Sequence, residues 1–147
     1  MKPRSIIIVN AFKIYLGIVL FFLVMYLFGL EKVTFLRFFN ILFVLWGVNA
    51  AIKSNLFKNK DNSYFSNLLI GFLTAFVAVI MVTFSFVIYL DRFNPEFLSV
   101  VGDSLMWGSE LTVGMVAFTI LFEGAASAVI STFILMQYWK NYEFDKG

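Results

Sequence analysis

The chain contains neither cysteine nor histidine. Without cysteine it can form no disulfide, no thiolate nucleophile and no cysteine-based metal site. Without histidine it lacks the imidazole ligand of most haem and zinc centres and the commonest general base. The sequence also contains no Walker-type glycine-rich loop, no zincin pattern and no nucleophile elbow. We therefore expect a protein that is not an enzyme, with no catalytic residues, no cofactor and no bound metal.

Charged residues are also scarce. They make up 14% of the 147 residues, whereas 61% are hydrophobic and 20 residues are phenylalanine. A soluble domain has about 25% charged and about 45–50% apolar residues. A small soluble protein leaves much of its surface in water, so it cannot hide this excess, and the apolar surface must face lipid. The lipid bilayer is therefore the first partner that the composition predicts, and a net charge of +2 gives no reason to expect nucleic acid.

Four apolar segments approach or exceed the length needed to cross a bilayer, which is about 20 residues. They cover about residues 11–30, 33–52, 68–90 and 111–138. We expect an all-α integral membrane protein, a single domain over residues 1–147, with four transmembrane helices in a bundle. No separate soluble domain is expected.

A further short helix is predicted between the third and fourth spans. Asn94, Pro95 and Glu96 are typical of a helix start, with a capping residue, a proline at the first position and an acid in the first turn. The apolar residues that follow recur at helical spacing. We expect an amphipathic helix over about 95–107 that lies at the membrane surface.

Four spans put both termini on one side of the membrane, and the basic residues are divided unevenly between the sides. The side of the termini has Lys2, Arg4, Lys13, Lys53, Lys58, Lys60, Lys140 and Lys146. The other side has Lys32, Arg37 and Arg92. Because cytoplasmic loops carry the excess of basic residues, we expect a multi-pass protein of the cell inner (plasma) membrane with both termini in the cytoplasm.

Small residues mark the faces on which the spans are expected to pack. Lipid offers no hydrogen bonds, so each span should turn its small and polar residues toward its neighbours. In the third span Gly71, Ala75 and Ala78 recur at helical spacing. In the fourth span Gly124 and Ala128 form a small-xxx-small pair. We interpret these five residues as helix-packing positions.

One acidic residue, Glu123, lies near the middle of the fourth span, and depth indicates which residues can approach it. Counting 1.5 Å per residue, it lies roughly 13 Å below the outer boundary of the membrane. In the second span, Asn40 and Arg37 lie roughly 10 Å and 6 Å below the same boundary. Thr119 and Ser127 share the helix face of Glu123. We therefore predict an intramembrane polar site made of these five residues.

The sequence leaves two interpretations of Glu123 open. A charged group at mid-span costs about 2.5–3.5 kcal/mol on insertion scales, and intramembrane acids are functional by default. Glu123 can be a proton or cation site, or a carboxylate that binds a partner. It can equally be a protonated or paired acid that only holds helices together.

Three stretches give the chain a recognisable layout. A basic middle loop, Lys58 to Ser63, leads into Tyr64, Phe65 and Gly71. An acidic segment, Asp91 to Phe97, follows the third span, and the closing span has a Gly/Ala/Ser centre, Glu123 to Ser131. This layout resembles the domain-of-unknown-function families of small, four-helix bacterial inner-membrane proteins. The resemblance implies an inner-membrane protein of unknown role and brings no assigned catalytic residues.

Two functions from different classes are compatible with these features. The missing chemistry, the small-residue faces and the tiny soluble portion favour a non-enzymatic accessory or structural subunit. Such a subunit would act through another membrane protein or by self-association. The alternative is a small transporter, or a proton- or cation-translocating subunit, that uses Glu123.

Overall fold

The computed structural model describes residues 2–30, 38–93 and 112–141. The four long helices are α1 (Pro3–Leu27), α2 (Asn40–Lys58), α3 (Tyr64–Ile88) and α5 (Val113–Trp139). A short π-helix, η2 (Tyr89–Phe93), continues directly from α3. These described ranges contain no β-strand. The all-α class expected from the composition is confirmed.

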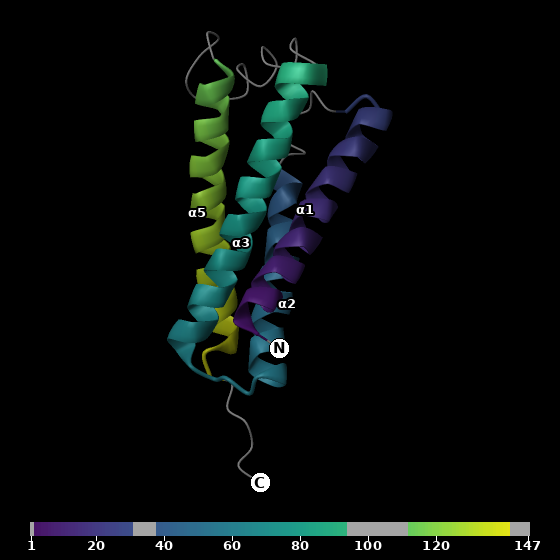
Figure 1. Cartoon of the computed structure of the whole chain (residues 1–147). Helices are drawn as coiled ribbons and strands as arrows, with labels where there is room; N and C mark the ends of the chain where they lie inside the picture. Colours follow the sequence, from purple (N-terminus) through teal and green to yellow (C-terminus); the bar gives the residue numbers. More distant parts are fainter. Residues whose placement is uncertain (1, 31–37, 94–111, 142–147) are drawn as a thin grey trace.

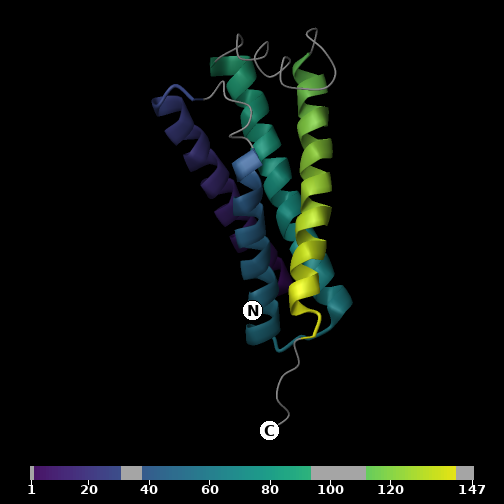
Figure 2. The same ribbon diagram turned by 180° about the vertical axis from the view of Figure 1, so that it is seen from behind.

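The long helices lie side by side and alternate in direction (Figure 1). α1 begins, and α5 ends, at the same end of the bundle as the α2–α3 turn (Figure 1), and we call this the termini end. α3 packs against α1, α2 and α5, and α2 also packs against α1 and α5. α1 and α5 therefore lie on opposite sides of the α2–α3 pair, as the view from behind also shows (Figure 2).

Local sequence explains the two ends of α1. Pro3 is the first helical residue, where its fixed φ suits the helix and its missing N–H would have no intrahelical partner. Beyond the last turn, Gly29 adopts a φ of 70°, in the left-handed region that favours glycine. Leu30 N–H then donates to the carbonyl of Met25 at 2.7 Å. This bond satisfies a carbonyl that the helix itself leaves without a donor.

Three of the helical segments are long and apolar enough to cross a membrane: Pro3–Leu27, Tyr64–Arg92 and Val113–Trp139. They overlap the spans expected at about 11–30, 68–90 and 111–138. The first begins earlier than expected, because Pro3 starts a helix that runs without a break into the apolar segment. Three potential spans in so short a chain support a membrane protein with a helix-bundle fold.

α2 differs from the other three long helices. It covers Asn40–Lys58, whereas a span at about 33–52 was expected. It is not among the helices apolar enough to cross a membrane, and it carries Asn49, Lys53 and Asn55 in its second half. Residues 31–37 lie outside the described part of the chain, as does the surface helix expected at about 95–107.

Glycines allow the helices to approach one another closely around α2 and α3. A Cβ atom built on Gly47 of α2 would overlap the side chain of Ile14 of α1. A Cβ atom on Gly71 of α3 would lie 3.0 Å from Thr132 of α5 and 3.1 Å from Val48 of α2. Close backbone approach through small residues is typical of helix contacts in membranes, where the apolar effect between helices is absent.

The main core lies between the four helices, near these glycines. Its buried side chains are Ala11, Ile14, Val44, Val48, Ile52, Leu56, Ala75, Ala78, Ala128 and Met136. The outer faces instead carry large exposed apolar side chains, such as Phe84, Phe118 and Phe122, each about 70% exposed. A surface of this kind is suited to lipid and not to water.

We expect Gly47→Ala to destabilise the protein. The added methyl group would meet Ile14, which is fully buried in the main core. Overpacking of this kind costs about 1–3 kcal/mol, measured as the unfolding free energy of the full chain in detergent. Gly114→Ala is the control, because the nearest atom to its added Cβ lies 3.9 Å away. Equal stability of the two variants would contradict the close packing at Gly47.

Candidate functional site

Glu123 lies on the flank of α5, where it is exposed. The next residue, Gly124, makes the contact with α3, since a Cβ atom built there would overlap Val79. Successive residues of an α-helix are rotated by about 100°, so Glu123 points to one side of this contact. The exposed position differs from the inward one that we expected for the polar residues of each span.

Contacts between helices fix the height of Glu123 in the bundle. Because Gly71 lies against both Thr132 of α5 and Val48 of α2, these two residues share a level. Counting from that level at 1.5 Å per residue, away from the termini end, Glu123 lies about 13 Å higher. Asn40, at the start of α2, lies about 12 Å higher. The carboxylate and the first turn of α2 therefore lie at the same height, which agrees with the depths estimated from the sequence.

The other residues of the predicted polar site are placed as follows. Thr119 and Ser127 lie one turn from Glu123 on either side, on the same flank of α5. The hydroxyl of Thr119 donates to the backbone carbonyl of Met115 at 2.9 Å. Asn40 Oδ1 is buried and accepts no hydrogen bond from the described residues. Arg37 lies outside the described part of the chain.

The predicted helix-packing residues lie at contacts between helices. Ala75, Ala78 and Ala128 are fully buried in the main core. Gly71 and Gly124 lie so close to neighbouring side chains that an added Cβ atom would be tightly packed or would overlap them. The spacing of small residues in the sequence therefore points to the same faces that the bundle uses.

A polar cluster that the sequence analysis missed joins α2 to α3 at their turn. Asn55 of α2 and Asn67 of α3 are buried, and Asn55 Nδ2 donates to Asn67 Oδ1 at 3.0 Å. Asn67 Nδ2 donates to the backbone oxygens of Asp61 and Ser63, both at 3.0 Å. Asn59 Nδ2 donates to Asn55 Oδ1 at 2.9 Å. In the sequence this cluster could have been recognised from two asparagines, Asn55 and Asn67, on either side of the turn-forming residues 59–63.

Asp61 is the only acidic residue in this turn, and it accepts several of the remaining hydrogen bonds. Ser66 Oγ donates to Asp61 Oδ2 at 2.7 Å, and the backbone N–H of Ser63 donates to Oδ1 at 3.0 Å. Asn55 Nδ2 also lies 3.4 Å from Oδ2. The bond from Ser66, then the one from Ser63, lower the pKa of Asp61 below its usual value of 3.8, against an opposing effect of partial burial.

Two hydrogen bonds between side chains connect other helix pairs. Trp139 Nε1 of α5 donates to Asn49 Oδ1 of α2 at 2.8 Å. The hydroxyls of Tyr15 on α1 and Ser85 on α3 are 2.7 Å apart. Both join residues far apart in the sequence, so they stabilise the relative positions of the helices.

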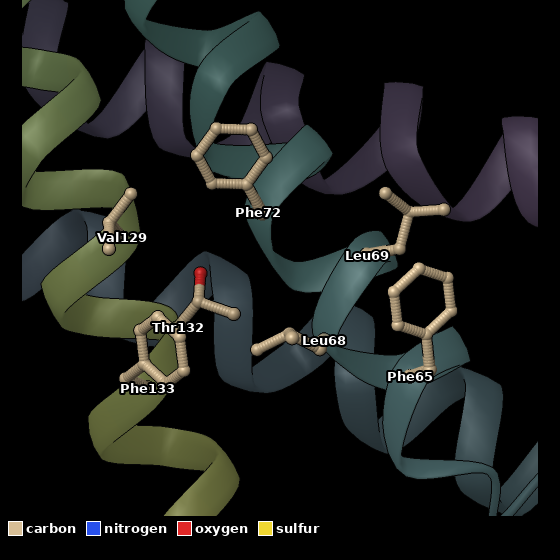
Figure 3. Close-up of a pocket in the computed structure, with 7 residues that line it drawn as sticks. All are labelled: Phe65, Leu68, Leu69, Phe72, Val129, Thr132 and Phe133. Atoms are coloured by element: carbon tan, nitrogen blue, oxygen red, sulfur yellow. The ribbon is translucent and has the colours of Figure 1, made fainter.

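A pocket of about 170 Å³ lies between α3 and α5 (Figure 3). Its lining is apolar apart from one hydroxyl, and consists of Phe65, Leu68, Leu69, Phe72, Val129, Thr132 and Phe133. That hydroxyl, Thr132 Oγ1, already donates to the carbonyl of Ala128 at 2.7 Å. The pocket therefore offers hydrocarbon surface and no group suited to a polar substrate.

The described residues contain no group of three or more acidic, histidine or cysteine side chains that could hold a metal ion. Comparisons with known proteins give no relative: no protein-family model, no curated protein and no solved structure matches the chain. Any function must therefore be argued from the geometry of the chain itself.

We expect Asp61→Asn to destabilise the α2–α3 turn at neutral pH. The asparagine has one acceptor oxygen in place of two and carries no charge, so Ser66 or Ser63 loses its acceptor. Losing a hydrogen bond to a charged group costs about 1.5–3 kcal/mol, measured as unfolding free energy in detergent.

The same variant should also change the dependence of stability on pH. Since the folded pKa of Asp61 is lowered, its contribution is complete above pH 3.8 and is lost as the pH falls through the folded pKa. In Asp61→Asn the free energy of unfolding should no longer include this pH-dependent contribution. Asp91→Asn is the control, because its carboxylate is 68% exposed beside Arg92 and contributes little. Identical pH profiles for the wild type and Asp61→Asn would contradict the network.

Proposed function

We propose that the chain is a small multi-pass protein of a bacterial inner membrane, with four transmembrane helices. It serves as a non-enzymatic accessory subunit that associates with another membrane protein or with further copies of itself. The observation that carries the proposal is the exposed carboxylate of Glu123 on a helix apolar enough to cross a membrane.

An acid at this position is expensive for a protein that is surrounded only by lipid. A charged side chain near mid-membrane costs about 2.5–3.5 kcal/mol on insertion scales. Contact with another protein chain along this flank of α5 removes the exposed side chain from lipid. Ser127 lies one turn from Glu123 on the same flank, whereas the hydroxyl of Thr119 is bonded to its own helix.

The fourth span is proposed to be α2. α2 packs against three helices that are each apolar enough to cross a membrane. Its carboxamides at Asn49 and Asn55 are hydrogen-bonded to neighbouring helices, so they need not face lipid. In this arrangement the polar residues that lower the hydropathy of α2 are shielded by the bundle.

The proposed orientation places the termini end in the cytoplasm. Basic residues described at that end are Lys2, Arg4, Lys53, Lys58, Lys60 and Lys140. At the opposite end, η2 carries the exposed pair Asp91 and Arg92. This distribution follows the rule that cytoplasmic segments carry the excess of lysine and arginine.

Glu123→Gln tests the proposed role of the carboxylate. We expect the variant to insert and fold normally but to associate about tenfold or more weakly, since it loses a hydrogen bond to a charged group. The measurement is affinity purification of the tagged full chain in mild detergent, followed by quantification of the co-purifying chains. Thr119→Val is the matched control on the same flank, because its hydroxyl already bonds to its own helix.

Two results would contradict the accessory role. Association that is unchanged in Glu123→Gln would remove the carboxylate from the interface. Normal association combined with loss of a proton or cation flux in proteoliposomes would instead favour a small transporter that uses Glu123.

The orientation is tested by single-cysteine labelling, for which a chain without cysteine gives no background. In intact cells a membrane-impermeant maleimide should label Asp91→Cys at once. It should label Asn62→Cys, in the α2–α3 turn, only after the inner membrane is permeabilised. The reverse pattern would invert the topology, and labelling of both sites in intact cells would rule out α3 as a span.

A further inference from the structure

A second and larger hollow opens between α1 and α2. It holds about 610 Å³, and its lining consists of Lys13, Leu16, Gly17, Leu20, Phe21, Phe39, Leu42, Phe43 and Trp46. Lys13 is the only charged residue among them, and the others present apolar surface. Leu20, Leu42 and Trp46 are each more than half exposed, so the hollow is an open groove on the outside of the bundle.

The packing of α1 on α2 explains the groove. The two helices approach closely near the middle of α2, where Gly47 lies against Ile14, and closer to the termini end Ile6 and Ala51 share a buried cluster. Toward the opposite end they diverge (Figure 2). Phe43 covers Gly17, and its ring centre lies 5.7 Å from that of Phe21. These aromatic side chains form the floor of a wedge whose sides are the two helices.

Lys13 lies at the end of the groove nearest the termini. Gly47 lies against Asn10 and Ile14, so Lys13 is level with the middle of α2. Lys53 lies about 9 Å closer to the termini end, six residues further along α2. Because side chains on a helix tilt toward its N-terminus, and α1 begins at the termini end, the ammonium group of Lys13 extends toward this basic surface. The groove therefore has a cationic end and an apolar remainder.

We infer that this groove binds one acyl chain of an anionic phospholipid from the leaflet on the side of the termini, with the lipid phosphate beside Lys13. The charges of the two match in sequence along the groove. The lipid has an anionic phosphate followed by a hydrocarbon chain, and the groove has the ammonium group of Lys13 followed by apolar side chains. Basic side chains near the surface of a membrane attract anionic lipids by about 1 kcal/mol each. The inference rests on the membrane insertion proposed above.

The described part of a second copy offers Lys13 no acidic partner at its own level. The acidic residues in the described part of the chain are Asp61, Asp91 and Glu123. The carboxylate of Asp61 is held in the turn by Ser66 and Ser63. Asp91 and Glu123 lie toward the opposite end, well above the level of Lys13. Lys13 lies about 9 Å from the level of Lys53, and a lysine side chain can extend along apolar surface toward a lipid phosphate near that level.

The test is native mass spectrometry of the full chain in detergent, titrated with phosphatidylglycerol and, for comparison, phosphatidylcholine. The wild type should retain one phosphatidylglycerol and prefer it to phosphatidylcholine. Lys13→Gln should weaken phosphatidylglycerol about fivefold and reduce the preference. Leu20→Trp should weaken both lipids, because the indole fills the groove. Lys140→Gln, at the end of α5 and away from the groove, and Leu23→Trp on α1 are the matched controls, and should bind like the wild type.

Three outcomes would overturn the inference. One is equal binding of both lipids by the wild type, and another is unchanged phosphatidylglycerol binding in both Lys13→Gln and Leu20→Trp. The third is efficient cross-linking between copies carrying Leu20→Cys, together with loss of bound lipid, which would make the groove an interface between chains. Because lipid binding in detergent does not depend on orientation or on Glu123, its failure is distinguishable from failure of the proposed function.

Discussion

The close approach of α2 and α3 to their neighbours fixes how the four helices are aligned along the axis of the bundle. Gly47 holds α2 against α1, and Gly71 holds α3 against both α2 and α5. In a bilayer the apolar effect does not drive helices together, so association depends on close packing and on hydrogen bonds between helices. Once the helices are fixed at these glycines, Glu123 is level with the first turn of α2, and Lys13 is level with its middle.

Hydrogen bonds reinforce this arrangement at the termini end of the bundle. At the termini end the α2–α3 turn is crossed by bonds among Asn55, Asn67 and Asp61. Trp139 joins α5 to α2 on the same half of the bundle. The buried cluster of Ile6, Ala51 and Ile70, which brings α1, α2 and α3 together, also lies in that half. The bundle is thus joined most firmly at one end, while α1 and α2 separate toward the other.

Much of the fold could be predicted from the sequence. Composition was sufficient for the all-α class, and run length for the three helices that can cross a membrane. The spacing of Ala75, Ala78 and Ala128 pointed to faces that are buried in the bundle. These features depend on residue type and helical period alone, which a sequence displays directly.

The candidate sites were less accessible to sequence analysis. A stripe through Thr119, Glu123 and Ser127 could not show that the neighbouring Gly124 would take the contact with α3, leaving the acid on the flank. The network at the turn depends on Asn55 and Asn67, which meet only after two helices fold against each other. The groove beside Lys13 depends on the angle between α1 and α2, and the residue pattern within either helix does not predict that angle.

Three threonines of the bundle use their hydroxyl groups within their own helix. Thr74, Thr83 and Thr132 each donate their hydroxyl to the carbonyl four residues earlier in the same helix. What Thr132 offers to α3 is its methyl carbon, 3.0 Å from where a Cβ atom of Gly71 would lie. Toward its neighbour it therefore behaves as a valine does. At these three positions the bundle is therefore less polar toward its neighbours than the residue type suggests, and a polarity scale applied to them overstates how well they could hold water or an ion.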